Sequence, residues 1–255
     1  MEISLLYSLI TGIFVGGAAG YIGSLMILQK MALVGDALSH VALPGIAIAL
    51  LLNINPFIGA FFVLAISILG IWALEKRTNL SMETLVGIFF TGSLALGLLI
   101  TPEAELLEAL FGDISKVSFF DMCIAIIISI IVVVMTSKIS KDYLLSIISK
   151  DLAKSSGVNT SRVNFIFLVL VAIIVAIGIK VVGTLLMGTL VIIPAACAKN
   201  ISTKFKKYSN LSFFFGSLSA FTGIMIADKL ALASGPIIIL AGVAIFVISL
   251  IFRKN

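Results

Sequence analysis

An aspartate and the only histidine of this chain lie four residues apart within a stretch that is otherwise apolar. Asp36 and His40 belong to the run Met31-Ala-Leu-Val-Gly-Asp36-Ala-Leu-Ser-His40-Val-Ala-Leu-Pro44-Gly45. On an α-helix, positions i and i+4 share a face, so the carboxylate and the imidazole can reach one ligand. Pro44 removes the hydrogen bond to the carbonyl of His40 and bends the helix. A carboxylate, an imidazole and a freed carbonyl on one turn suit a borderline divalent cation.

The depth of these two residues favours a role in transport. If the helix enters a membrane near Lys30, His40 lies about 15 Å in, at the middle of a ~30 Å hydrocarbon core, and Asp36 lies about 9 Å in. A charge at such depth costs about 2.5–3.5 kcal/mol on insertion scales and is usually functional. The alternative is a buried pair that hydrogen-bonds this helix to a neighbour. Because borderline metals usually take four or more ligands, a metal here needs others from a second copy, carbonyls or water.

The elements that must position this pair are apolar segments of membrane-spanning length. Of the 255 residues, 61% are hydrophobic and 11% are charged, whereas soluble domains carry roughly 25% charged residues. We therefore predict an all-α, polytopic integral membrane protein with about nine transmembrane helices, and with eight as the alternative. The expected spans, each close to the ~20 residues that a bilayer requires, are 4–27, 32–52, 57–74, 84–100, 119–137, 163–179, 182–198, 211–227 and 236–252.

The distribution of basic residues predicts the orientation of these spans. With the N-terminus outside and the C-terminus in the cytoplasm, 14 of the 17 lysines and arginines lie on the cytoplasmic side, and Lys116, Lys180 and Lys229 lie outside. Cytoplasmic loops carry such an excess of basic residues. The net charge of +5 is thus a topology signal, and we expect no nucleic-acid partner.

The longest cytoplasmic loop, residues 137–162, contains an amphipathic stretch. From Tyr143 to Ser156 the sequence alternates apolar and polar residues at roughly helical spacing. Gly157 follows in the position of a C-cap. We expect a short helix on the cytoplasmic face, which either lies on lipid or docks into the groove of a partner.

Three segments together resemble the permease subunits of the metal-uptake ABC transporters, the family that serves zinc, manganese and iron(II). The first runs from Met31 to Gly45, the second from Asp142 to Asn164 and the third from Val182 to Ala198. The resemblance implies a type II ABC importer-like fold, with residues 1–255 as a single transmembrane permease domain. It also implies a homodimer with the translocation path at its interface, in a prokaryotic cell membrane.

The resemblance further implies partners and functional residues. It predicts two cytoplasmic ABC ATPase subunits and an extracytoplasmic solute-binding protein that delivers the metal. Asp36 and His40 match the family's metal-coordinating positions inside the membrane. The region 142–159 is similar to a coupling helix that docks on the ATPase, and its candidate coupling residues are Asp142, Asp151, Lys154 and Gly157.

Two prolines lie within apolar segments of the chain. Pro44 and Pro194 each interrupt an apolar helix, and such breaks are tolerated where the backbone lines a cavity; the alternative is a simple packing kink.

The sequence lacks a G-x-x-x-x-G-K-[ST] phosphate loop. We therefore expect a transport subunit that is not an enzyme and binds no permanent cofactor, with ATP on a partner and a divalent metal as cargo.

One other class of membrane protein is compatible with parts of this pattern, and a second class is excluded by it. A secondary transporter driven by an ion gradient would use Asp36 and His40 as a proton relay. An intramembrane metalloprotease needs H-E-x-x-H, which a chain with one histidine cannot supply. The choice among zinc, manganese and iron stays open, because Asp and His suit all three metals.

Overall fold

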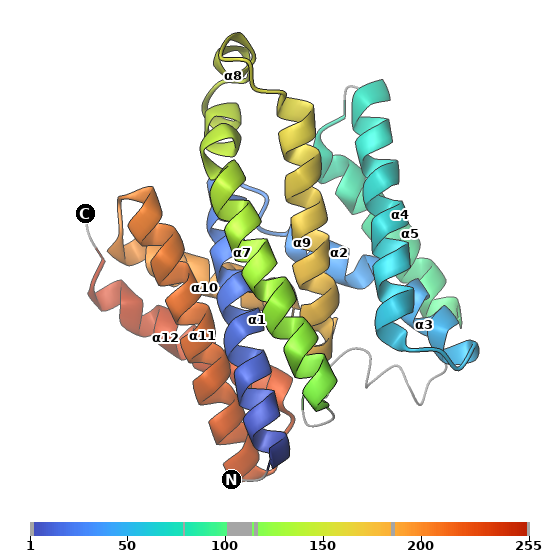
Figure 1. Cartoon of the computed structure of the whole chain (residues 1–255), viewed down its shortest axis with the longest axis vertical. Coiled ribbons are helices and arrows are strands. Elements are labelled where there is room, and N and C mark those ends of the chain that lie inside the picture. The colour runs from blue at the N-terminus through green and yellow to red at the C-terminus, as the bar shows by residue number, and fades with distance from the viewer. Residues whose placement is uncertain (1–2, 79, 101–113, 115–116, 185–186, 254–255) are drawn as a thin grey trace.

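The computed structural model describes residues 3–78, 80–100, 114, 117–184 and 187–253, and the elements in these ranges are α-helices (Figure 1). This confirms the all-α prediction. In chain order the helices are α1 (Ile3–Leu28), α2 (Val34–Val41), α3 (Leu43–Leu51), α4 (Pro56–Arg77), α5 (Met82–Ile100), α7 (Phe119–Ile148), α8 (Lys150–Ser155), α9 (Thr160–Val182), α10 (Met187–Ile201), α11 (Phe205–Leu230) and α12 (Ser234–Ile251).

Short polar signals begin several of these helices. Within lipid, a helix satisfies its own backbone groups, so long apolar segments fold this way. At the helix ends, side chains form hydrogen bonds with the backbone groups that have no partner within the helix. Asn55 caps α4 and Asn159 caps α9, each through a side-chain oxygen that accepts a backbone N–H. Ser118 and Asp121 form a reciprocal capping box at the start of α7.

Eight helical segments in the described part of the chain are long and apolar enough to cross a membrane, when α2 and α3 are counted together as the segment Val34–Leu51. This number matches the alternative of eight, and the ninth expected span is represented by a shorter helix. In place of the expected span 182–198, α9 continues to Val182 and α10 begins only at Met187. With 15 residues, α10 is about 22 Å long at ~1.5 Å per residue, less than a ~30 Å hydrocarbon core.

The expected span 32–52 is divided into two helices. α2 ends at Val41 and α3 begins at Leu43, with Ala42 between them. Pro44 is the second residue of α3. The break therefore lies close to His40 and two residues before Pro44, and Ala42 itself keeps helical dihedral angles (φ −72°, ψ −21°).

The helices pack side by side around α1 and α9, which are buried along most of their length. α1 contacts α7, α9, α10 and α11, while α4 and α5 stand beside α3 at one side of the bundle (Figure 1). The N-terminus lies at one end of the bundle, and α8 lies at the opposite end. The short helix α2 crosses the interior, where it contacts α5, α9 and α10.

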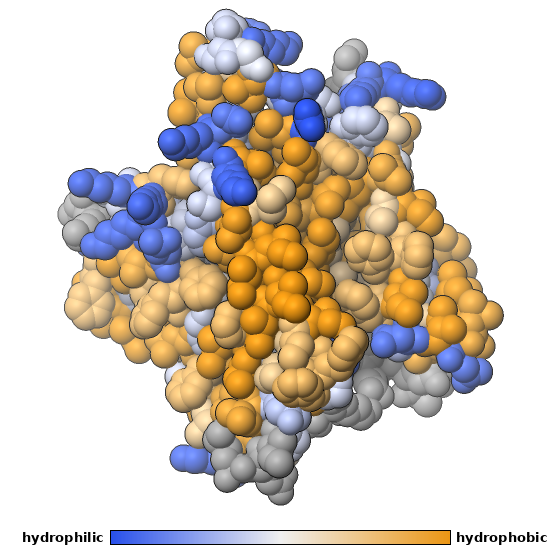
Figure 2. Space-filling view, viewed as in Figure 1, coloured by the Kyte–Doolittle hydropathy of each residue, from blue (hydrophilic) through white to orange (hydrophobic). Residues whose placement is uncertain are grey.

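The surface of the bundle has the polarity of a membrane protein. A broad apolar zone covers the middle of the molecule in Figure 2, and hydrophilic side chains gather at the end that carries α8 and near the C-terminus. Large apolar side chains on the outward faces of α4, α5, α7 and α12 are exposed, including Phe62, Leu99 and Ile251. Such faces suit contact with lipid chains or with a second membrane-embedded chain.

Candidate functional site

The Asp36–His40 turn lies on α2, in the interior of the bundle. His40 is buried, with 8% of its surface exposed, and Asp36 is partly buried. Apolar contacts position the helix, because Val34, Leu38 and Val41 are all buried on it. The helical spacing of the two residues, predicted from the sequence, is confirmed.

One hydrogen bond determines which imidazole nitrogen is available to a ligand. The Nδ1 atom of His40 lies 2.9 Å from the backbone carbonyl oxygen of Asp36. A carbonyl oxygen only accepts, so Nδ1 carries the proton and donates it. In a neutral imidazole, Nε2 then keeps the lone pair that binds a metal. The ring also packs edge-on against Phe90 of α5, with 5.4 Å between ring centroids.

The other side of the turn is held by the connection between α9 and α10. The hydroxyl of Ser39 lies 2.6 Å from the carbonyl oxygen of Thr184, which follows α9 in the chain. Gly188 of α10 lies against the backbone of Asp36: a Cβ atom at this glycine would come within 2.6 Å of the Asp36 Cα. Only a residue without a side chain allows this approach.

The donor set of the turn is small. Among the described residues, no group of three or more His, Cys, Asp or Glu side chains is close enough together to hold a metal ion. The turn offers one carboxylate and one imidazole, while most bound divalent metals take at least four ligands. Such a partial set fits a site that binds an ion transiently, because conduction requires the ion to leave again.

The two prolines differ in their effect. Pro44 follows the interruption at Ala42 and lies beside α5 near Gly97. The prediction that Pro194 interrupts its helix is wrong, because α10 is continuous from Met187 to Ile201 with the proline inside it. The Pro194 ring packs against α1, with its Cβ 3.0 Å from the place of a Cβ on Gly20. A helix accommodates such a ring where neighbouring helices support it.

The expected amphipathic helix is two helices. α7 continues to Ile148, so Asp142 belongs to its last turns, and only residues 150–155 form the separate helix α8. Ser149 has an extended backbone between them, and its hydroxyl accepts the N–H of Leu152 to cap α8. A pattern of apolar and polar residues does not reveal such a change of helix direction, because it persists on both sides of the bend.

The predicted cap at Gly157 is confirmed. Its φ is +79°, a left-handed conformation that glycine adopts without steric cost. The N–H of Gly157 donates to the carbonyl of Lys154, and that of Val158 donates to Ala153, which is a Schellman motif. Asp142, Asp151, Lys154 and Gly157 are all exposed, as are the apolar side chains of Ile148 and Leu152. The tip around α8 therefore presents both charged and apolar groups.

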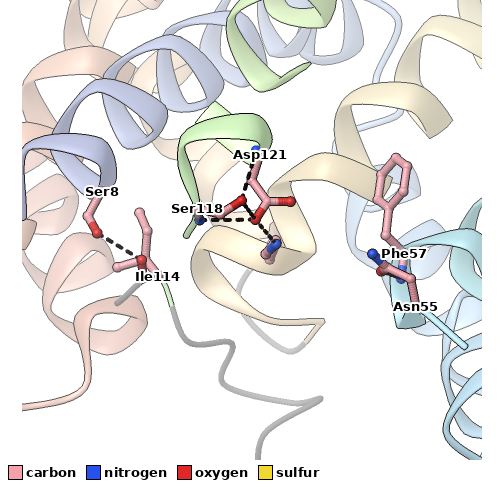
Figure 3. A network of polar contacts seen from close by, with 7 residues as sticks. Ser8, Asn55, Phe57, Ile114, Ser118 and Asp121 are labelled. Atoms are coloured by element: carbon pink, nitrogen blue, oxygen red, sulfur yellow. Dashed lines mark hydrogen bonds and ion pairs between the residues drawn. The ribbon is translucent and has the colours of Figure 1, made fainter. Parts of the chain in front are cut away.

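A polar network that the sequence pattern does not reveal joins α7 to α9. Figure 3 shows the carboxylate of Asp121, which accepts hydrogen bonds from the backbone and hydroxyl of Ser118. The same carboxylate lies 2.7 Å from the ammonium of Lys180, in the last turn of α9. The ion pair thus joins the N-terminal end of one helix to the C-terminal end of another.

Comparison with known families decides what this bundle is. The model of the ABC 3 transport family matches residues 2–253. The chain belongs to this family. The family resemblance predicted from the three sequence segments is confirmed, and the ABC 3 chain is a multi-pass membrane protein with the fold of an ABC transporter permease.

Proteins with high similarity to this ABC 3 chain have metal-transport names. The manganese transport system membrane protein MntC of Listeria monocytogenes is 34% identical over 252 residues, which cover 97% of this chain and 90% of that protein. The high-affinity zinc uptake system membrane protein ZnuB of Haemophilus influenzae is 33% identical over 255 residues, covering 97% of each. The structure of PsaBC from Streptococcus pneumoniae in complex with Fab matches with a TM-score of 0.85 and 30% identity, over 98% of this chain and 91% of that one.

Proposed function

We propose that this chain is the permease subunit of an ABC importer that moves a divalent transition metal, namely zinc, manganese or iron(II), into the cell. The observation that carries the proposal is the Asp36–His40 turn on the interrupted helix α2–α3. Transporter sites are commonly formed by interrupted helices near the middle of the membrane. The manganese and zinc names of the relatives support the cargo class. They do not favour a gradient-driven transporter.

The chemistry of the turn supports transient ligation of the cargo. The Nε2 atom of His40 offers a neutral imidazole nitrogen, because Nδ1 donates to the carbonyl of Asp36. The Asp36 carboxylate offers oxygen and negative charge. Imidazole suits zinc and iron, and carboxylate oxygen suits manganese, so this mixed pair is compatible with all three cargoes.

The missing ligands favour a homodimer with the path at its interface. Two side chains leave the coordination shell incomplete, and a second copy of the chain can supply the same two groups around the path. Large exposed apolar faces on α4, α5 and α12 offer surface for such a contact. Pro44 and Pro194 are proposed to lie along the path, the former through the interruption that it causes near His40.

Energy and cargo come from partners. We assign ATP hydrolysis to separate cytoplasmic ABC subunits, and delivery of the metal to an extracytoplasmic solute-binding protein. The exposed tip around α8, with Asp142, Asp151, Lys154 and Gly157, is the proposed contact with the ATPase. Charged residues beside exposed Leu152 make this tip suitable for a protein groove. Movement of this tip would then open the path inward.

Orientation follows from charge. We place the end that carries α8 and the C-terminus in the cytoplasm, with the N-terminus outside. The hydrophilic side chains gathered at the α8 end and near the C-terminus in Figure 2 support this assignment. The chain then forms one permease domain in the cell membrane, in contact with lipid.

Metal uptake into vesicles tests this function. Vesicles containing the permease, its ATPase and its binding protein are loaded with ATP or with a non-hydrolysable analogue. Zn(II), Mn(II) and Fe(II) are then compared for the wild type, Asp36→Ala and His40→Ala. We expect ATP-dependent uptake of at least one metal by the wild type, and a loss of about tenfold or more in each variant, because each removes half of the side-chain donor set.

Asp228→Ala is the matched control. Asp228 is an exposed aspartate at the end of α11, so its removal changes the same chemical group away from α2. Uptake should then stay at the wild-type level. Undiminished uptake by Asp36→Ala and His40→Ala in assembled complexes would contradict the site assignment. A wild-type complex that moves none of the three metals would contradict the cargo class.

A further inference from the structure

Ser39 lies between the two residues of the candidate metal site and has contacts of its own. Its side chain is fully buried. The hydroxyl oxygen lies 2.7 Å from the carbonyl oxygen of Asp36 and 2.6 Å from that of Thr184. It also lies 3.4 Å from the Nδ1 atom of His40. One hydroxyl therefore contacts both residues of the site and a segment 145 positions away in the chain.

The protons can be assigned in this cluster. A serine hydroxyl has one proton, so it donates to one carbonyl at a time. His40 Nδ1–H donates to the carbonyl of Asp36. The arrangement in which each carbonyl receives a donor has the Ser39 hydroxyl donating to Thr184. The same arrangement leaves the Ser39 oxygen free to accept, at longer range, from the protonated Nδ1.

The backbone at the end of α9 is shaped for this contact. Gly183 has φ +79° and ψ 173°, a region that is essentially restricted to glycine. This conformation ends α9 and turns the chain so that the next carbonyl, of Thr184, faces Ser39. Four residues further on, Gly188 of α10 contacts the backbone of Asp36. Thr184 after α9 and Gly188 in the first turn of α10 thus contact the turn at two points.

On the side of α5, the turn meets an aromatic ring. Phe90 packs edge-on against the imidazole of His40. The imidazole can rotate about its side-chain bonds unless both its nitrogen and its ring edge are fixed. The Nδ1 bond to the Asp36 carbonyl fixes the nitrogen, Phe90 fixes the ring edge, and Ser39 fixes the turn itself to the α9–α10 connection.

We propose that Ser39 is a positioning residue for the transported metal: through the carbonyl of Thr184 it holds the Asp36–His40 turn, and so aims Nε2 of His40 and the Asp36 carboxylate at the ion. This inference rests on the proposed function and deepens it. In this proposal Ser39 acts through its hydrogen bond to Thr184 and not as a ligand. A movement at the end of α9 reaches the ligands through this hydrogen bond, and a movement of α10 reaches them through the contact of Gly188 with the Asp36 backbone.

Direct binding of Mn(II) to the permease tests the proposal. The permease, purified with its ATPase subunits in lipid nanodiscs, is titrated with Mn(II), and free Mn(II) is measured by electron paramagnetic resonance. We expect Ser39→Ala to raise the dissociation constant about tenfold, which is the effect of one buried hydrogen bond. Ser39→Thr keeps the hydroxyl and should bind within about threefold of the wild type on the same scale.

The matched control is Ser212→Ala. Ser212 is fully buried on α11, and its hydroxyl donates to the carbonyl of Tyr208 in the same helix. Its removal should leave Mn(II) binding unchanged. If Ser39→Ala does not assemble, Ser39→Cys takes its place, because a thiol keeps the volume and donates weakly; the same weakening is expected.

Asp36→Ala separates this proposal from the proposed function. If Asp36→Ala abolishes binding while Ser39→Ala or Ser39→Cys binds within twofold of the wild type, the positioning role is wrong and the site remains. Equal weakening in Ser39→Ala and Ser39→Thr would also contradict the positioning role, because the hydroxyl would then not matter. If Asp36→Ala and His40→Ala bind Mn(II) as the wild type does, the site itself is wrong.

Discussion

Asp36 and His40 hold their relative positions through the backbone. The imidazole of His40 donates to the carbonyl of Asp36, so the link between the two residues uses a main-chain oxygen. In the proposed metal site, this arrangement would fix the tautomer of the histidine before an ion binds. A metal ligand that is oriented in advance loses less freedom when the ion binds, and a partner on the second nitrogen is typical of metal-binding histidines.

The close approach of α10 to this turn is a second requirement at the residue scale. In Gly188→Ala, the new methyl group would come within 2.6 Å of the Asp36 Cα, so α2 and α10 must move apart. Overpacking of this kind usually costs about 1–3 kcal/mol. A cost of about 1.4 kcal/mol, which lies within this range, corresponds to a factor of ten. We therefore expect ATP-driven metal uptake per assembled complex to fall about tenfold. Vesicle uptake with Mn(II) and Zn(II) measures it.

Gly92→Ala is the control for this variant. A Cβ at Gly92 on α5 meets nothing within 4 Å in the chain. Its uptake should match that of the wild type. Normal uptake by Gly188→Ala would show that the α2–α10 distance does not matter for transport.

At the scale of elements, the separation of α8 from α7 is the feature with most consequence. Ser149 ends one helix and caps the next, and Gly157 closes α8 with a Schellman motif. A helix of 6 residues is too short to be stable alone. Its conformation at the exposed tip therefore depends on these two caps and on buried Ala153.

Gly157→Ala tests whether the shape of this tip matters for coupling. Alanine at φ +79° is strained by about 1 kcal/mol, and asparagine is better tolerated. We expect Gly157→Ala to bind Mn(II) normally but to associate with the ATPase more weakly and to lose ATP-driven uptake several-fold. Gly157→Asn should show a smaller loss. Co-purification with the ATPase and vesicle uptake measure the two effects, and wild-type association by Gly157→Ala would count against the coupling role.

At the scale of the whole molecule, exposed lysines near the two ends of the bundle allow the proposed orientation to be tested. Lys154 on α8 and Lys229 at the end of α11 are exposed on opposite sides in the proposed orientation. Lys116 and Lys254 also belong to the predicted charge distribution, but they lie outside the described residues. Because basic residues are retained on the cytoplasmic side, the orientation can be tested from either end.

Cysteine labelling measures the orientation. Cys123 and Cys197 are free and are first replaced by alanine. Lys154→Cys should then react with a membrane-impermeant maleimide only in inside-out vesicles, and Lys229→Cys only in right-side-out vesicles. The reverse pattern would place the N-terminus in the cytoplasm and overturn the proposed orientation.

The local features of this protein follow closely from its sequence. The apolar segments, the interruption near Pro44 and the cap at Gly157 are all visible in the order of residues. Each depends on residues that are close together in the chain. A continuous apolar run has the length that a bilayer requires, proline lacks an N–H, and glycine tolerates a left-handed backbone. The helical face shared by Asp36 and His40 is of the same kind.

The remaining features depend on contacts between distant segments. The sequence does not indicate that α10 begins only at Met187, that its helix continues through Pro194, or that α8 is limited to residues 150–155. Nor does it pair Asp121 with Lys180. Packing against neighbouring helices determines these helix bounds and this ion pair, and a local sequence pattern does not indicate such packing.

The Asp36–His40 turn combines local features with contacts between distant segments. The sequence by itself determined an aspartate and a histidine on one helical face beside a proline, because helical spacing and proline geometry are local. Only the tertiary structure brought Thr184 to Ser39 and Gly188 to Asp36. These contacts join segments about 150 residues apart, and they arise from the burial of α2 between α5, α9 and α10.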